Sequence, residues 1–125
     1  MPTKKITFNN NKGYQLSAKI DLPLKKNPFP FVIFSHVFTG NKNLVASKHI
    51  SRALTMNGFG VMRFDFTGLG ESEGDFEDTN FSSNVDDLLA AAEYLEKEYM
   101  APAVIVGHSL GGAAALFAGK KLETV

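Results

Sequence analysis

Three short segments of this chain have the pattern of strands buried inside a sheet. Residues 31–34 and 103–106 are apolar at every position, and residues 61–64 are apolar except for Arg63. Apolar residues recur at helical spacing between and after these segments, over residues 43–57, 85–95 and 113–121. This alternation of strand and helix predicts an α/β fold with a mostly parallel sheet, right-handed crossovers and helices on both faces.

An N-terminal β-hairpin is predicted ahead of these strand–helix units. Apolar and polar residues alternate over residues 4–8 and 14–22, and residues 9–13, Asn-Asn-Asn-Lys-Gly, have turn chemistry. The chain has 125 residues and 44% hydrophobic content, which suits one globular domain. We therefore expect a single domain over residues 1–125, with a hairpin followed by three strand–helix units.

Composition excludes several classes of function. Lys plus Arg and Asp plus Glu number 13 each, so no net charge favours binding to nucleic acid or to an anionic membrane. The chain has no cysteine, which excludes a disulfide framework, a thiolate metal site and a cysteine nucleophile. No signal-peptide pattern or bilayer-spanning run occurs in the sequence, so we expect a cytoplasmic, soluble protein.

A serine between glycines, in the motif Gly-His-Ser-Leu-Gly at residues 107–111, is the segment that carries chemistry. It lies where the third predicted strand meets the last predicted helix. Gly107 and Gly111 let strand and helix approach closely around a sharp turn that presents Ser109 as a nucleophile. The N–H of Leu110, at the start of the helix, is the first expected donor to a developing oxyanion. A chance occurrence in a glycine-rich turn is the alternative, and the flanking strand and helix argue against it.

Gly68 and Gly70, after the second buried strand, begin the Gly-x-Gly-x-x-Gly pattern of a dinucleotide site. Glu73 stands in place of the third glycine, and the acids beside this turn would repel a pyrophosphate. The sequence therefore predicts no dinucleotide, no other cofactor and no metal. It predicts instead a shaped loop near the pocket, held by Arg63 and Asp65.

Other polar residues have structural interpretations. His36 directly follows a buried strand, far upstream of Ser109, so we favour a ring that braces its loop through backbone hydrogen bonds. The alternative is that His36 or His108 serves as an unconventional catalytic base. Helix capping and N-terminal charge are predicted for four residues near the second helix, Ser83, Asn84, Asp86 and Asp87.

The chain resembles the α/β-hydrolases over nearly its whole length. The resemblance rests on the order and spacing of the loop at His36, residues 63–74, residues 80–84 and residues 107–112. More closely, the run from residue 63 to residue 84 is similar to the hydrolase part of bacterial proteins in which this domain precedes an OsmC-like, peroxide-reducing domain. Ser109 is then identified as the nucleophile of a serine esterase-like hydrolase.

This resemblance implies hydrolysis of a carboxylic ester or related acyl bond of a small molecule through an acyl-serine. It also implies a second oxyanion donor in the loop after the first buried strand, which by position is the N–H of Phe38. Val37 departs from the glycine that many relatives have there. Its β-branched side chain disfavours a positive φ, so we expect this loop to be differently shaped.

The rest of the catalytic triad is not found after Ser109. The family order is serine, then acid, then histidine, but the chain after Ser109 has Glu123 as its sole acid and no histidine. We therefore expect the N-terminal half of an α/β-hydrolase fold, poorly active alone. Residues 103–106, central in the family's sheet, would here form an exposed apolar edge. The alternative is a non-catalytic binding or assembly module that forms a homodimer through this edge.

Overall fold

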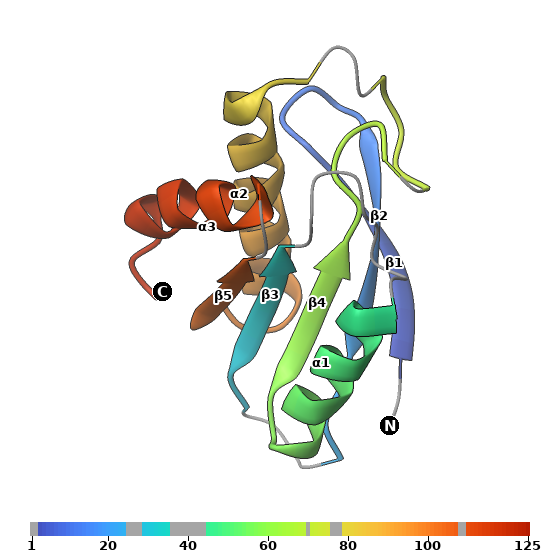
Figure 1. Cartoon of the computed structure of the whole chain (residues 1–125), viewed down its shortest axis with the longest axis vertical. Helices are drawn as coiled ribbons and strands as arrows, with labels where there is room; N and C mark the ends of the chain where they lie inside the picture. Colours follow the sequence, from blue (N-terminus) through green and yellow to red (C-terminus); the bar gives the residue numbers. More distant parts are fainter. Residues whose placement is uncertain (1–2, 25–28, 36–44, 70, 76–78, 108–109) are drawn as a thin grey trace.

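A five-stranded sheet with helices on both faces organises the chain in the computed structural model (Figure 1). The structure describes residues 3–24, 29–35, 45–69, 71–75, 79–107 and 110–125, without the side chains of residues 45–47, 110–113 and 117. The elements in chain order are β1 (Thr3–Asn9), β2 (Gln15–Asp21), β3 (Phe31–Ser35), α1 (Val45–Met56), β4 (Gly60–Phe64), α2 (Phe81–Glu98), β5 (Val104–Gly107) and α3 (Leu110–Lys121). The predicted hairpin and strand–helix units are confirmed.

The strands lie in the order β1-β2-β4-β3-β5. β2 is antiparallel to β1 and to β4, whereas β3 is parallel to both β4 and β5. β2 alone therefore runs against the direction of the other strands. The α/β fold with a mostly parallel sheet is confirmed.

Asn10 fixes the turn of the hairpin. Its side-chain Oδ1 accepts the N–H of Lys12 at 3.0 Å and the N–H of Tyr14 at 2.9 Å, as in an Asx turn. Gly13 has a φ of +83°, a conformation that glycine adopts without steric cost. The turn thus sets which residues of β1 and β2 pair, and with them which side chains face the core.

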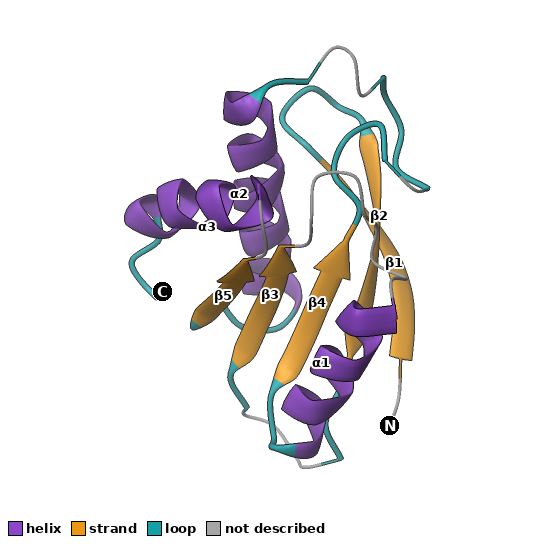
Figure 2. Ribbon diagram, viewed as in Figure 1, coloured by secondary structure: helices purple, strands orange, loops and turns teal. Residues whose placement is uncertain are grey.

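The main core lies between the sheet and the helices α2 and α3. Alternate strand residues point to this face, among them the fully buried Ile33, Met62 and Phe64, and they pack with Leu88 and Leu95 of α2. Complete burial of one such leucine contributes roughly 1.5–3 kcal/mol. α1 lies on the opposite face, where it contacts β4 and β2 (Figure 2).

The start of α2 differs in part from the prediction. Oδ1 of Asn80 accepts the N–H of Ser83 at 2.8 Å, and Oγ of Ser83 accepts the N–H of Asn80 at 2.9 Å, which makes a capping box. The predicted capping role of Ser83 is confirmed. The interpretation of Asn84, Asp86 and Asp87 as capping or terminal charge is wrong, because the cap is Asn80 and the first turn of α2 contains no acidic residue.

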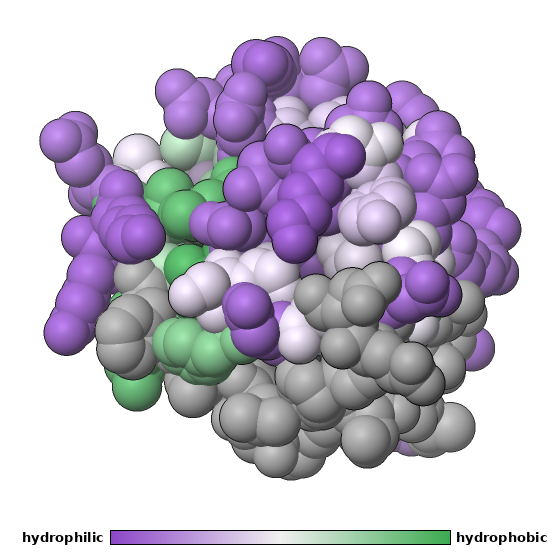
Figure 3. All heavy atoms as spheres, turned by 90° about the horizontal axis from the view of Figure 1, so that it is seen from above, coloured by the Kyte–Doolittle hydropathy of each residue, from purple (hydrophilic) through white to green (hydrophobic). Residues whose placement is uncertain are grey.

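β5 forms one edge of the sheet and is only partly covered. Val104 is 41% exposed, while Ile105 and Val106 are half-buried. The expectation of an exposed apolar edge is confirmed, because no strand among the described residues pairs beyond β5. The expectation that residues 103–106 are buried on both faces is wrong, because this edge position leaves them partly exposed. Leu116 of the neighbouring α3 is 72% exposed. Seen from above, apolar side chains gather on the side of the molecule where α3 lies (Figure 3).

Candidate active site

The carboxyl ends of β3 and β5 lie side by side. Ser35, the last residue of β3, is the register partner of Gly107, the last residue of β5, and Ser35 is fully buried. Adjacent strands are about 4.8 Å apart. The predicted oxyanion loop leaves β3 directly after Ser35, and the segment with the predicted nucleophile leaves β5 directly after Gly107. Two segments that are far apart in the sequence therefore start from neighbouring backbone positions.

The predicted site residues are only partly within the described chain. His36, Phe38, His108 and Ser109 lie outside the described residues. Gly107 ends β5, and α3 begins with Leu110 and Gly111. The first N–H groups of a helix have no acceptor within the helix, so they can donate to an anion at its start. The helix thus begins with the residue after Ser109.

Asp65 organises the loop that follows β4. Its side chain is fully buried, and Oδ2 accepts the N–H of Glu71 at 3.1 Å. Its carbonyl oxygen accepts the hydroxyl of Ser72 at 2.5 Å. Gly68, with a φ of +78°, donates its N–H to the carbonyl oxygen of Glu73 at 3.0 Å. These bonds fold the loop back on itself at the carboxyl end of β4.

The same loop is attached to β2. The N–H of Glu73 donates to the carbonyl oxygen of Gln15 at 2.9 Å, and the N–H of Gln15 donates to Oε1 of Glu73 at 2.7 Å. The N–H of Ser17 donates to Oγ of Ser72 at 3.0 Å. Because β2 extends past the end of β4, it offers these backbone groups to the loop. The loop is therefore held as a fixed wall at this end of the sheet.

Asp87 attaches the loop to α2. Its Oδ2 accepts the N–H and the hydroxyl of Thr67 at 2.8 and 2.7 Å, and its Oδ1 accepts Nδ2 of Asn10 at 3.2 Å. Burial raises the pKa of the Asp87 carboxyl above its ordinary value, although the hydrogen bonds from Thr67 and Asn10 oppose this effect. The sequence analysis missed this contact. The sequence does carry a signal for the burial of Asp87, because helical spacing places Asp87 on the same face of α2 as the buried Ala91 and Leu95.

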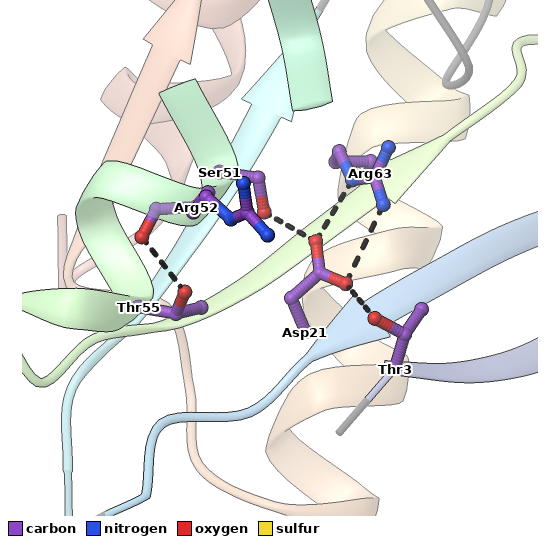
Figure 4. A network of polar contacts seen from close by, with 6 residues as sticks. All are labelled: Thr3, Asp21, Ser51, Arg52, Thr55 and Arg63. Carbon is purple, nitrogen blue, oxygen red and sulfur yellow. Dashed lines mark hydrogen bonds and ion pairs between the residues drawn. The ribbon is translucent and has the colours of Figure 1, made fainter. Parts of the chain in front are cut away.

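Arg63, which the sequence analysis placed beside this loop, forms an ion pair on the α1 face of the sheet (Figure 4). Its Nε donates to Oδ2 of Asp21 at 3.0 Å. Asp21 also accepts the hydroxyl of Thr3 at 2.7 Å and that of Ser51 from α1. Burial raises the pKa of Asp21, but the hydrogen bonds from Ser51, Thr3 and Arg63 outweigh it and hold the pKa below its ordinary value. The network ties β1, β2, β4 and α1 together.

The described residues offer neither a metal site nor a membrane-spanning helix. They contain no group of three or more His, Cys, Asp or Glu side chains that could hold a metal ion. No helix in the described part of the chain is long and apolar enough to cross a membrane.

Solved structures share this architecture. The esterase domain from a Rhodothermus marinus protein is 45% identical, with a TM-score of 0.80 over 99% of this chain and 49% of that one. Est1E from Butyrivibrio proteoclasticus, solved with ferulic acid bound, is 29% identical, with a TM-score of 0.83 over 93% of this chain and 47% of that one. The chain thus spans about half the length of these structures, covering 49% and 47% of them. The fold is that of the α/β-hydrolases.

The sequence also identifies the family. Residues 27–124 match the family described as serine aminopeptidase, S33, and the chain belongs to this family of α/β-hydrolases. Palmitoyl-protein thioesterase ABHD10, mitochondrial, from Bos taurus is 30% identical over 87 residues, which are 70% of this chain and 28% of that protein. The predicted membership of the α/β-hydrolases is confirmed.

Proposed function

We propose that this domain carries the nucleophile of a serine hydrolase that cleaves a carboxylic ester or related acyl bond through an acyl-serine at Ser109. The observation that carries the proposal is the register pairing of Ser35 with Gly107. Because of this pairing, the loop with Phe38 and the turn with Ser109 each follow a strand end, and the two strand ends are neighbours. Relatives named as an esterase and a thioesterase support cleavage of an acyl bond, and the ferulic acid bound to Est1E supports a small-molecule substrate.

The proposed acylation begins when Oγ of Ser109 attacks the carbonyl carbon and passes its proton to a base. The N–H groups of Leu110 and Phe38 donate to the oxyanion that forms, and loss of one such donor in other enzymes costs about 2.7–4 kcal/mol of transition-state stabilisation. The carbon–oxygen bond to the leaving alcohol then breaks, and the alcohol takes the proton. Water hydrolyses the acyl-serine, which releases the carboxylic acid and restores Ser109.

The base and acid of this mechanism are assigned to residues beyond these 125. Glu123 is the sole acid after Ser109, and no histidine follows it. His36 is assigned to bracing its loop, and His108, Gly107 and Gly111 to the geometry of the turn. Asp65 supports the site by folding the loop after β4 against β2. In the same proposal, the domain is similar to the hydrolase part of OsmC-like fusion proteins, which rests on residues 63–84.

Turnover of p-nitrophenyl acetate tests this assignment. The protein expressed from its complete gene should hydrolyse the ester, and Ser109→Ala should lower kcat by at least about a thousandfold. Ser82→Ala, at an exposed serine, is the matched control and should keep the activity. Residues 1–125 expressed alone should show negligible turnover. Serine-dependent turnover by residues 1–125 alone, at the level of ordinary esterases, would overturn the assignment of acid and base to other residues.

A second candidate function is a non-catalytic module that assembles through β5. The observation that favours it is the partly exposed edge strand, with Val104 41% exposed and Leu116 of α3 72% exposed. An uncovered apolar edge can pair with a second copy of the chain. Size exclusion with light scattering should then show a dimer that Val104→Lys dissociates, and a monomer at high concentration would count against this function.

A further inference from the structure

A hollow of about 470 Å³ lies between α1 and the N-terminal hairpin, on the α1 face of the sheet. Its size is within the range of small-molecule sites in proteins. The hollow lies apart from the ends of β3 and β5, since it is formed by β1, β2, β4 and α1. The charged residues and histidine that line it are Lys19, Asp21, Lys48, His49, Arg52 and Arg63.

The lining of the hollow is strongly basic. All of these residues except Asp21 are lysine, arginine or histidine. The charge of Asp21 is already balanced by Arg63, whose Nε lies 3.0 Å from the carboxylate. Neither Lys48 nor Arg52 has an ion-pair partner among the described residues. The chain as a whole has equal numbers of acidic and basic residues, so this excess is a local feature.

The floor of the hollow is fixed before any ligand arrives. The side chains of Arg63 and Asp21 are 5% and 11% exposed, and Ser51 of α1 donates to the same carboxylate (Figure 4). A buried ion pair with further hydrogen bonds holds its members in one geometry. Charges beside such a buried floor attract an anion more strongly than charges on an open surface.

Lys48 and Arg52 are an unfavourable pair unless an anion lies between them. They are four residues apart on α1, so they project to the same side, about 6 Å apart along the helix axis. Like charges at this spacing destabilise a helix by roughly 0.2–0.5 kcal/mol. α1 contains no acidic residue that could offset them. One dianionic group can contact both side chains, and His49 adds a further donor on the same helix.

We infer that this hollow binds a small molecule through a phosphate or pyrophosphate group. Lys48 and Arg52 would contact the anion from α1, and His49 would donate to it. Lysine and arginine are the side chains that proteins use for phosphate groups. The site does not depend on the chemistry of Ser109.

Inorganic pyrophosphate at low ionic strength is the probe, with binding measured by titration calorimetry on the protein expressed from its complete gene. The double variant Lys48→Gln, Arg52→Gln removes two exposed charges, so it should fold normally, which circular dichroism checks. The control variant Lys120→Gln, Lys121→Gln removes the same charge from the last turn of α3. Wild type and control should bind one equivalent, and the Lys48, Arg52 variant should bind at least about tenfold more weakly.

Three outcomes would overturn the inference. The first is that pyrophosphate does not bind the wild-type protein saturably. The second is an equal loss of affinity in both double variants, which would mean a response to net charge alone. The third is binding to phosphatidylserine vesicles that depends on Lys48 and Arg52 without saturable binding of pyrophosphate, which would mark a membrane-binding surface.

Discussion

Thr67 donates both its backbone N–H and its hydroxyl to one carboxylate oxygen of Asp87, at 2.8 and 2.7 Å. Thr67 belongs to the loop after β4, and Asp87 belongs to α2, so a single carboxylate joins the loop to the helix. Oδ1 of Asp87 also accepts a hydrogen bond from the side chain of Asn10, in the hairpin turn. Three segments that are distant in the sequence are therefore held at one buried carboxylate.

The first prediction concerns this carboxylate. Asp87→Ala leaves the N–H and hydroxyl of Thr67 without their acceptor, removes one of the two acceptors of Asn10 Nδ2, and should lower the free energy of unfolding by about 2–3 kcal/mol. Asp86→Ala is the matched control. Among the described residues, the side chain of Asp86 makes one hydrogen bond, which is exposed and comes from Asn11. This substitution should change the stability by less than about 0.5 kcal/mol. Urea denaturation measures both, and equal losses would contradict the proposed role of Asp87.

The second prediction separates backbone strain from steric overlap in the loop. Gly74 and Gly13 both have positive φ, +92° and +83°. A Cβ at Gly74 would lie 2.6 Å from Cγ2 of Thr67, whereas a Cβ at Gly13 would meet nothing within 4 Å. Gly13→Ala should cost about 1 kcal/mol of stability for the left-handed conformation. Gly74→Ala should cost about 1–3 kcal/mol more, and equal midpoints in thermal unfolding would disprove the close packing against Thr67.

The third prediction concerns the pH dependence that Asp21 contributes. Its pKa in the folded protein lies below the ordinary value of 3.8. Between the two values the unfolded chain binds more protons, so stability rises with pH there. The stabilisation is complete above 3.8 and is lost as pH falls through the lower folded value. Asp21→Asn should therefore lower the free energy of unfolding by roughly 2–4 kcal/mol at pH 7.

This difference between wild type and Asp21→Asn should narrow as the pH falls below 3.8. Urea denaturation at a series of pH values measures it. Asp75→Asn, at an exposed position of the loop after β4, controls for the loss of one carboxylate charge. A difference that stays constant from pH 7 to acid would show that the ionised carboxylate of Asp21 is not what stabilises the network.

The strands and helices could be predicted because each carries its own periodicity. Residues 31–34 are apolar at every position and are buried as predicted, in a strand that α2 and α3 contact. The turn at residues 9–13 was predictable from asparagine and glycine, whose local backbone chemistry needs no tertiary partner. Where a segment's conformation depends on its own residues, sequence reasoning succeeded.

Contacts between distant segments could not be predicted in this way. Asp87 and Asn84 resemble surface residues of a helix start, and only the packing of α2 against the loop and the hairpin buries them. The partner of Arg63 is Asp21, which lies on another strand and becomes a neighbour only through the pairing of β2 with β4. Ile105 illustrates the same limit, because an apolar strand is buried only if a neighbour covers it.

The loops that would carry the chemistry were predictable as motifs, since the turn at Ser109 combines residue types with a strand and a helix on either side. That the two loops start side by side was implied only by the resemblance to the α/β-hydrolases, because it depends on β3 and β5 being neighbours in the sheet. The register pairing of Ser35 with Gly107 supplies that relationship. It places the last residues of β3 and β5 next to each other.

Labelling with a fluorophosphonate probe tests the proposed nucleophile most directly. The probe is applied to the protein expressed from its complete gene, and the adduct is located by mass spectrometry of peptides. We predict one adduct, on Ser109, that is lost in Ser109→Ala and kept in Ser82→Ala. An adduct on another residue, or labelling that persists unchanged in Ser109→Ala, would contradict the assignment of Ser109 as the nucleophile.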